Sequence, residues 1–377
     1  MINTAEALPA PVIGMKDRVR WIFSNCPEDL DAVVIMNGEE PLLDVAFPYV
    51  TGTKAGLFEG CLGIITPDGR STVITSALEE TSAREGKAEV MTFRTSKERE
   101  ELAVDLLKGL RKVGVNGLGI IHANYLHVKR WAGNAELVDV SAGLEASRLI
   151  KDREEVERMR RACRIASQVA DEIPGMLRMG MKEYEMAAEL NYRMMRLGSS
   201  GPAFGTNASF GASSAEPHHE AEDIALRDGD TALFDFGCKV EGYCSDITRT
   251  FFVGEVKEWQ RRMYEVVSQA QQAALKVIRA GVNGRDVDAA ARAVIDASEF
   301  RGLMVHSTGH GLGLSVHDGG RMAPNHDFPL KAGMVLTVEP GVYIRGQGGV
   351  RIEDDVLITE DGYEMLTSAD KRMRVIQ

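Results

Sequence analysis

Residues 306–318 read HSTGHGLGLSVHD, and this segment holds three of the eight histidines of a 377-residue chain. The middle histidine, His310, is flanked by Gly309 and Gly311, which have no Cβ atom to keep a metal ion or a substrate away from the backbone. Histidine clusters of this kind are candidates for metal sites. The alternative interpretation is a glycine-rich loop whose histidines only form hydrogen bonds. The acidic residues elsewhere in the sequence decide between the two.

Two acidic residues lie close together in an apolar context. Asp235 is inside the apolar stretch 231–237, and Asp246 follows eleven residues later, beyond a turn at Gly242. Two strands of one hairpin would place both carboxylates near each other on the same face. Two close carboxylates repel and shift each other's pKa unless a cation neutralises them.

Two further acids have similar surroundings. Glu339 lies in the apolar run 335–340, and Glu353 follows Val350-Arg351-Ile352. A charge inside an apolar strand is costly unless it is paired or bound to a metal. Any one of these acids is more simply interpreted as a charge at a strand edge. Four of them in the same half of the chain as a glycine-flanked histidine favour a cation site.

The second half of the chain contains an internal repeat with a shift of 101 residues, the distance from Gly180 to Gly281. Over the 32 positions of residues 157–188 this shift gives eight identities, where chance gives about two. The glycines before and after Asp235 are spaced like those around Glu339. Two copies of a helix-helix-strand unit around a pseudo-twofold axis would place these two acids at equivalent positions. Coincidence among common residues is the alternative.

Composition excludes several classes of protein. The chain is 44% hydrophobic with a formal net charge of −12, which is ordinary for a soluble protein and disfavours nucleic-acid or anionic-membrane partners. No run approaches the roughly 18 apolar residues of a membrane span, and residues 1–15 do not resemble a secretory signal. Five cysteines without a Cys-x-x-Cys pair are typical of reduced thiols, with a Cys238–Cys244 bond as the alternative. We therefore expect a cytoplasmic protein.

The length exceeds that of a usual single core, so two domains are expected. We place the boundary between residues 148 and 149, where a mixed α/β pattern gives way to long amphipathic helices. The elements predicted before it are helices over 16–24 and 97–112, strands over 32–36, 118–121 and 136–140, and a hairpin over 63–75. After it we predict helices over 152–173 and 182–197.

The spacing of the four acids and His310 resembles the five-ligand site of the pita-bread metallopeptidases. This family includes methionine aminopeptidase, aminopeptidase P, Xaa-Pro dipeptidase (prolidase) and the metal-free creatinase. Residues 306–318 are similar to the signature of aminopeptidase P and prolidase. The resemblance implies an α+β fold, with a pita-bread catalytic domain of pseudo-twofold repeat over residues 149–377. It also implies a smaller, mixed α/β, ribonuclease-H-like domain over residues 1–148.

The resemblance assigns each ligand a role. Asp235 would bind one of two divalent metal ions, His310 and Glu339 would bind the other, and Asp246 and Glu353 would bridge both. Four carboxylates and one imidazole suit Mn²⁺, Co²⁺, Fe²⁺ or Zn²⁺. Two such ions lower the pKa of a shared water and polarise the scissile carbonyl. Glu339 would also take the proton of that water.

The resemblance also implies groups that contact the substrate. His218 matches the histidine near the leaving nitrogen, and His317 matches a hydrogen-bond donor to the transition state. His306 matches the histidine that lines the proline pocket. Arg351 matches an arginine that binds the substrate carboxylate in prolidase, and bracing of Glu353 is the alternative.

The other histidines have simpler interpretations. We interpret His219 as an exposed neighbour of the substrate-side histidine, His326 as a surface residue, and His122 and His127 as structural residues of the first domain. The segment 207–216 departs from the prolidase pattern. The wall of the substrate site is therefore expected to differ from that of the family.

The activity implied is that of a cytoplasmic, metal-dependent Xaa-Pro dipeptidase, acting as a homodimer on small peptides. The close alternative is aminopeptidase P, which acts on longer Xaa-Pro peptides. A metal-dependent lyase or another non-peptidase hydrolase on the same scaffold is a second alternative, because a fold alone does not fix function. A non-catalytic binding module is disfavoured, because such modules are expected to have lost ligands.

Overall fold

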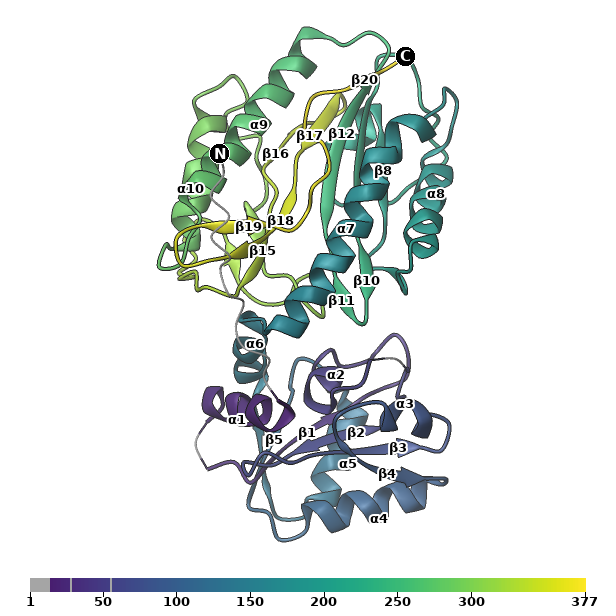
Figure 1. The fold of residues 1–377 in the computed structure, drawn as a ribbon, viewed down its shortest axis with the longest axis vertical. Helices are drawn as coiled ribbons and strands as arrows, with labels where there is room; N and C mark the ends of the chain where they lie inside the picture. The colour runs from purple at the N-terminus through teal and green to yellow at the C-terminus, as the bar shows by residue number, and fades with distance from the viewer. Residues whose placement is uncertain (1–13, 28, 55) are drawn as a thin grey trace. The chain divides into compact units, whose positions relative to one another are not determined.

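Figure 1 shows the fold in a computed structural model, which describes residues 14–27, 29–54 and 56–377. The chain divides into two compact units, of which the first ends at Arg148 and the second extends from Leu149 to Gln377. The prediction that residues 1–15 hold no secretory signal falls almost entirely outside the described residues. Among the helices of the described part, none is long and apolar enough to cross a membrane.

The first unit is built on one mixed sheet. Its strands lie in the order β4-β3-β2-β1-β5-β6, antiparallel within β3-β2-β1 and parallel at both flanks. The predicted hairpin is present, because Ile65 pairs with Ser71 across the Pro67-Asp68-Gly69 turn. The strands are β1 (Ala32–Met36), β2 (Leu62–Ile65), β3 (Ser71–Ser76), β4 (Glu89–Phe93), β5 (Lys112–Val115) and β6 (Glu136–Asp139). The helices are α1 (Met15–Asn25), α2 (Ala46–Thr51), α3 (Glu80–Arg84), α4 (Ser96–Leu107), α5 (His122–Trp131) and α6 (Ser141–Leu149).

Two predictions for this unit are wrong. The helix expected over 97–112 ends at Leu107, because Gly109 takes a left-handed φ of 79° and the chain then enters β5. The strand expected over 118–121 is a turn that leads into α5. Short apolar runs do not separate strand from helix or turn by pattern alone. The apolar run that joins the sheet is β5, because it pairs with β1, and residues 118–121 follow it outside the sheet.

Helices flank the strands in the second unit, with α7 and α8 on one side and α9 and α10 on the other (Figure 1). These helices are α7 (Arg153–Met176), α8 (Glu183–Arg196), α9 (Glu258–Val277) and α10 (Gly284–Asp296). The first residues of α8 and α10 are 101 positions apart, which is the shift of the predicted repeat. The apolar face predicted for α7 is buried, from Val156 to Ile173. Each large apolar side chain buried on it contributes about 1.5–3 kcal/mol.

Two antiparallel strand pairs of this unit correspond to each other in the repeat. β9 (Thr231–Phe236) pairs with β12 (Ile247–Val253), and β15 (Val335–Val338) pairs with β18 (Asp354–Ile358). The other strands are β7 (Gly201–Pro202), β8 (Asn207–Phe210), β10 (Cys238–Val240), β11 (Tyr243–Cys244), β13 (Gly309–His310), β14 (Arg321–Met322), β16 (Gly341–Ile344), β17 (Gly348–Arg351), β19 (Tyr363–Met365) and β20 (Val375–Ile376). A 3₁₀ turn, η1 (Gly211–Ala215), follows β8. All five cysteines are free, so Cys238 and Cys244 do not form a disulfide.

Candidate metal centre

The ends of the equivalent strands bring the predicted ligands together. Asp235 lies in β9, opposite Thr248 of β12, and Asp246 directly precedes β12. Glu339 directly follows β15, and Glu353 directly precedes β18. The hairpin predicted for Asp235 and Asp246 is therefore present, with the short strands β10 and β11 inserted at its tip.

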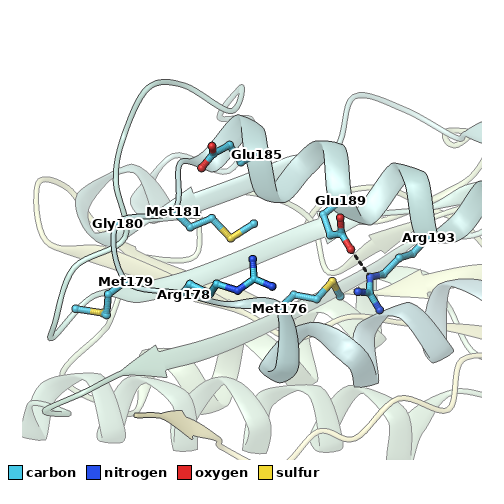
Figure 2. A pocket seen from close by; sticks show the side chains of 8 residues that line it. All are labelled: Met176, Arg178, Met179, Gly180, Met181, Glu185, Glu189 and Arg193. Carbon is cyan, nitrogen blue, oxygen red and sulfur yellow. Dashed lines mark hydrogen bonds and ion pairs between the residues drawn. The ribbon is translucent and has the colours of Figure 1, made fainter.

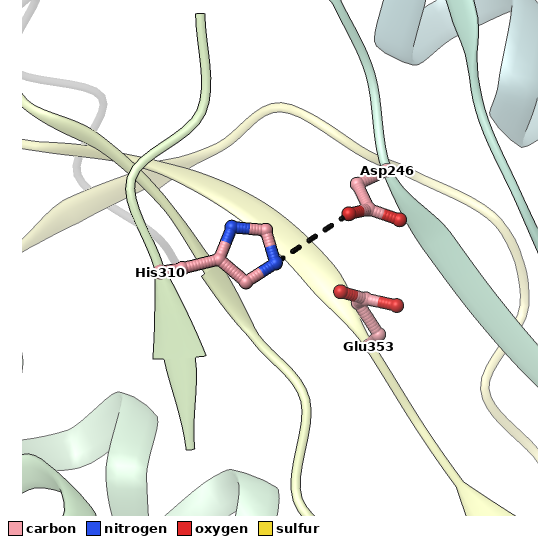
Figure 3. Close-up of side chains that lie close together, drawn as sticks. All are labelled: Asp246, His310 and Glu353. Carbon is pink, nitrogen blue, oxygen red and sulfur yellow. Dashed lines mark ion pairs between the residues drawn. The ribbon is translucent and has the colours of Figure 1, made fainter. Parts of the chain in front are cut away.

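Three of the five predicted ligands form a tight group. One ligand atom each from Asp246, His310 and Glu353 lies within 4.8 Å of the other two. Figure 3 shows the His310 ring pointing at the carboxylate of Asp246, with Glu353 beside it. His310 Nε2 is 3.7 Å from Asp246 Oδ2 and 3.4 Å from Glu339 Oε1. Glu339 thus adjoins the same group.

Asp235 belongs to the site through its charge and is held by an arginine. Its Oδ2 accepts a 2.6 Å hydrogen bond from Arg351 Nη2. Its negative charge also raises the pKa of Asp246, Glu353 and Glu339, so it lies near all three carboxyls. The structure therefore brings all five predicted ligands into one site.

Burial at this site disfavours the charged forms of both the acids and the histidine. Burial, and then the neighbouring carboxylates, raises the pKa of Asp246 and Glu353 well above their ordinary values. Burial raises the pKa of Glu339 to about 7 and lowers the pKa of His310 to about 3. Each shift favours the neutral form, which is the expected response of buried ionisable groups that lack a counter-charge.

The residues present fit a divalent metal ion. Among the described residues, Asp235 Oδ1 and Asp246 Oδ1 are buried oxygens with no hydrogen-bond partner. Buried polar atoms are nearly always satisfied, so two carboxylate oxygens without a hydrogen-bond partner beside an imidazole fit a cation-binding site. His310 Nδ1 lies 3.1 Å from the Gly311 carbonyl and donates to it, which leaves the Nε2 lone pair facing the acids.

The glycines around His310 have a packing role that the sequence did not indicate. A Cβ on Gly309 would lie 2.0 Å from the Thr337 carbonyl oxygen, and a Cβ on Gly311 would lie 1.9 Å from that of Gly319. Both glycines therefore allow backbone segments to pack closely against each other. The expectation that they also make room for a metal ion or a substrate stays a prediction.

Hydroxyl groups that the sequence pattern did not single out orient the ligands. Thr248 Oγ1 donates to Glu353 Oε2 at 2.5 Å and accepts from Arg351 Nε at 3.0 Å. Thr337 Oγ1 accepts from His310 N at 3.1 Å and lies 3.4 Å from Glu339 Oε1. In the sequence, the only sign of this role is that each threonine lies two residues from a predicted ligand, Thr248 from Asp246 and Thr337 from Glu339.

Two further side chains that hold residues of the site in place were not predicted from the sequence. Asp355 Oδ2 accepts from the backbone N–H of the ligand Asp246 at 2.9 Å and from Cys163 Sγ at 3.2 Å. Tyr343 accepts from Arg351 Nη1 at 2.8 Å and donates to His306 Nε2 at 2.7 Å, because His306 Nδ1 donates to the Ser307 carbonyl. The partners in these contacts are distant in sequence or lie on different strands, so no local pattern revealed them.

Arg351 braces the site through all three of its side-chain nitrogens. Its side chain is buried, and each of its three nitrogens donates to a neighbour: Asp235, Thr248 and Tyr343. It therefore holds one candidate ligand directly and a second, Glu353, through Thr248. Of the two roles considered for Arg351, these contacts support the bracing role.

The three substrate-side histidines lie around the same centre. The rings of His317 and His310 are 4.3 Å apart and nearly perpendicular. Burial and the nearby Arg321 lower the pKa of His317, and burial lowers that of His306 to about 4. His218 is exposed, and its charge contributes to both shifts, so it faces the same space.

The interpretation of His219 as an exposed neighbour is wrong. Only 7% of its side chain is exposed, and its Nε2 lies 2.7 Å from the buried carboxylate of Glu183. His326 and His122 are exposed, and His127 is half-buried against Trp131. The partner of His219 lies 36 residues earlier in the chain, which the sequence pattern did not reveal.

A pocket that contains none of these ligands lies between the end of α7, the loop after it and one face of α8 (Figure 2). Its lining includes three methionines, Met176, Met179 and Met181, and the acidic residues Glu185 and Glu189. None of the candidate ligands or substrate-side histidines lines it. Glu189 is paired with Arg193, as Figure 2 shows, so this charge is already neutralised.

Comparison with known proteins identifies the class to which this fold and site belong. Residues 157–360 match metallopeptidase family M24, and residues 26–150 match the creatinase/prolidase N-terminal domain. The chain belongs to metallopeptidase family M24. It is 36% identical over 313 residues to the Xaa-Pro dipeptidase of Pyrococcus furiosus, an alignment that covers 82% of this chain and 88% of that protein.

Solved structures agree with the predicted fold class. The Xaa-Pro dipeptidase of Bacillus anthracis superposes with a TM-score of 0.87 at 31% identity, covering 96% of this chain and 99% of that one. The X-Pro aminopeptidase of Thermotoga maritima gives a TM-score of 0.85 at 31% identity, covering 92% and 98%. The pita-bread fold and the metallopeptidase class predicted from the sequence are both confirmed.

Proposed function

We propose that this chain is a metal-dependent Xaa-Pro dipeptidase. The observation that carries the proposal is that four acids and one imidazole converge in a member of family M24. Two buried carboxylate oxygens of this group have no hydrogen-bond partner among the described residues. The similarity to the dipeptidase of Pyrococcus furiosus supports the same substrate class. The amide before proline carries no N–H, so a dedicated site is needed to recognise it.

The ligand set would hold two divalent ions, drawn from Mn²⁺, Co²⁺, Zn²⁺ or Fe²⁺. Asp246 and Glu353 would bridge the two ions, Asp235 would bind one, and His310 with Glu339 would bind the other. When bound, such ions lower the pKa of a shared water and polarise the scissile carbonyl. Oxygen-rich donors with one imidazole suit these metals better than softer ones.

Proton transfer falls to Glu339 and the histidines. The carboxylate of Glu339 adjoins the ligand group, with Oε1 3.4 Å from His310 Nε2, so it is placed to act as the general base. The lowered pKa of His317 keeps its imidazole neutral, and a neutral imidazole N–H donates a hydrogen bond to developing negative charge. His218, exposed toward the same space, would contact the peptide near the leaving nitrogen.

Substrate positioning falls to His306 and the groups behind it. His306 is neutral, because burial lowers its pKa to about 4, and Tyr343 fixes its ring by a 2.7 Å hydrogen bond. A fixed, uncharged ring of this kind suits contact with the apolar proline ring. Arg351 holds Tyr343 and Asp235 in place from behind.

We further propose a cytoplasmic homodimer. The five free cysteines agree with a reducing compartment, and the dimer follows from the resemblance to related enzymes. Light scattering coupled to gel filtration measures the assembly, and a monomer at micromolar concentration would contradict this part of the proposal.

Steady-state kinetics of the metal-reconstituted enzyme test the substrate class. The enzyme is loaded with Mn²⁺ or Co²⁺ and compared on an Xaa-Pro dipeptide and on Xaa-Pro-Yaa-Yaa with the same first residue. We expect a higher kcat/KM on the dipeptide. A better rate on the tetrapeptide would replace the proposal with aminopeptidase P activity, and no cleavage of either would overturn it.

A further inference from the structure

Glu183 is a fully buried carboxylate at the first position of α8. It accepts four hydrogen bonds, and every donor belongs to residues 210–222, which we call the histidine loop. The donors are Phe210 N (2.7 Å), Ser213 Oγ (2.5 Å), His219 Nε2 (2.7 Å) and Glu222 N (3.0 Å). One side chain therefore ties both ends and the middle of the histidine loop to a rigid helix.

Burying the Glu183 carboxylate costs free energy, and this cost favours the one loop conformation that supplies its hydrogen bonds. A buried carboxylate is strongly unfavourable unless its oxygens are hydrogen-bonded. Hydrogen bonds to a charged acceptor are about twice as strong as neutral ones. Because all four come from the histidine loop, Glu183 is satisfied only when that loop has its present conformation.

The histidine loop presents His218 between two anchored neighbours. The next residue, His219, points inward to Glu183, and the carbonyl of the preceding residue, Pro217, accepts from Asn207 Nδ2 at 3.3 Å. His218 itself is exposed. The backbone on both sides of His218 is thus fixed, while its side chain stays accessible.

The equivalent helix of the other repeat holds its own substrate-side segment in a similar way. Asp288 on α10 accepts from Thr308 N at 3.0 Å and from Thr308 Oγ1 at 2.9 Å. Its ion-pair partner Arg292 donates to the carbonyl of His306 at 3.0 Å. In both halves, a buried acid on the second helix anchors the segment that carries a histidine.

We propose that Glu183 and His219 are positioning residues that hold His218 against the substrate. This inference rests on the proposed function for the role of His218, but the anchoring itself does not. Misplacing a catalytic group by about 1 Å is enough to cost about 100-fold in rate. Because the anchor does not touch the metal ligands, its loss should lower kcat and leave metal affinity unchanged.

A set of variants on the full-length, metal-loaded enzyme tests the inference. His219→Ala removes one donor to Glu183, and we expect kcat to fall about 10-fold with KM and metal affinity within about twofold of wild type. His219→Gln restores a donor at the same number of bonds from the backbone and should recover most of the activity. Glu183→Gln places an amide N–H₂ against two of the four donors and should cost about 100-fold. Glu155→Gln, at a buried glutamate in the first turn of α7, is the matched control and should retain activity.

A double-mutant cycle shows whether the anchor acts through His218. In a His218→Ala background, His219→Ala should cost less than about twofold more, because the group that it positions is already gone. An undiminished 10-fold loss in that background would overturn the inference. A His219→Gln variant no better than His219→Ala would also overturn it.

Hydrogen exchange tests the anchor without any substrate. In Glu183→Gln, the amides of the histidine loop should exchange faster, while those of β9 and β12 keep their protection. Unchanged exchange in the histidine loop would overturn the inference. If the wild-type enzyme cleaves no Xaa-Pro peptide, the proposed function fails, and these exchange rates still decide whether Glu183 and His219 hold His218.

Discussion

Thr248 and Glu353 are 105 residues apart in the chain and joined by a 2.5 Å hydrogen bond from the threonine hydroxyl to Oε2 of the glutamate. The same hydroxyl accepts from Arg351 Nε, and Thr248 lies opposite Asp235 in the β9–β12 register. One threonine side chain therefore links the two halves of the repeat at the candidate metal centre.

Removing this hydroxyl should weaken metal binding. Thr248→Val keeps the shape of the side chain but leaves Glu353 Oε2 and Arg351 Nε without their shared partner. Loss of such an orienting group typically costs about 10–100-fold in metal affinity or activity. Titration of the metal-free protein with Mn²⁺ measures the change, and Thr248→Ser is the control that keeps the hydroxyl. Equal affinity in the valine and serine variants would contradict this role.

Metal binding should stabilise the fold through Asp246. A ligand that binds only the folded state at about 100 times its Kd adds about 2.7 kcal/mol. Excess Mn²⁺ is therefore expected to raise the Tm of the wild-type protein, and a chelator should reverse the increase and abolish activity. Asp246→Ala removes a proposed bridging ligand, so its Tm should not respond to Mn²⁺; an increase of the same size as in wild type would exclude Asp246 as a ligand.

His317 should separate catalysis from metal binding. Its ring packs against that of His310 but belongs to none of the close ligand contacts. We expect His317→Ala to bind as much metal as the wild type, measured by elemental analysis, and to lose about 100-fold or more in kcat. His326→Ala, at an exposed histidine, is the control. Normal turnover in His317→Ala would show that the assigned role is wrong.

Much of the site could be predicted because its signals are local. An acid inside an apolar run is costly when the run is buried, and this cost marks Asp235 and Glu339 in the sequence alone. The turn at Gly242, which has a φ of 84°, correctly indicated that Asp246 returns beside Asp235. The 101-residue repeat correctly predicted that α8 and α10 are equivalent.

Other features could not be predicted because their causes are distant in sequence. His219 has the local context of an exposed loop residue, and only the fold brings Glu183 to it. Gly311 is a glycine because the backbone at Gly319 passes 1.9 Å from where its Cβ would be, a contact made by the fold. Residues 118–121 resemble a strand, but the pairing partners of β1 are already β2 and β5.

The metal-free protein should lose stability as the pH rises above neutrality. Burial raises the pKa of Glu339 from 4.5 to about 7 and that of Asp355 from 3.8 to about 8, so the folded state holds protons that the unfolded state releases. Stability from a raised pKa is present at low pH and is lost as the pH rises through the folded value. The lowered pKa values of His306 and His310 act in the opposite direction only below about pH 6.5. Between pH 6.5 and 8 the Tm of the metal-free protein should therefore fall.

Glu339→Gln isolates one contribution to this pH dependence. The stability advantage of the wild type over this variant should shrink between pH 5 and 7, by up to about 3 kcal/mol at 1.36 kcal/mol per pKa unit. Glu360→Gln, at an exposed glutamate, should show no such change. Saturating Mn²⁺ should remove the decline, because metal binding requires the deprotonated carboxylates. A pH-independent difference between wild type and Glu339→Gln would contradict the shifted pKa.

Arg351→Lys should decide between the two roles considered for this arginine. Lysine keeps the charge, but its single ammonium group does not replace a planar guanidinium that donates to Asp235, Thr248 and Tyr343 at once. If Arg351 braces the site, kcat/KM should fall by the same factor, about 10–100-fold, on an Xaa-Pro dipeptide and on its C-terminal amide. Arg345→Lys, at an exposed arginine after β16, is the matched control. A loss confined to the KM of the free dipeptide, with the amide unaffected, would show instead that the guanidinium binds the substrate carboxylate.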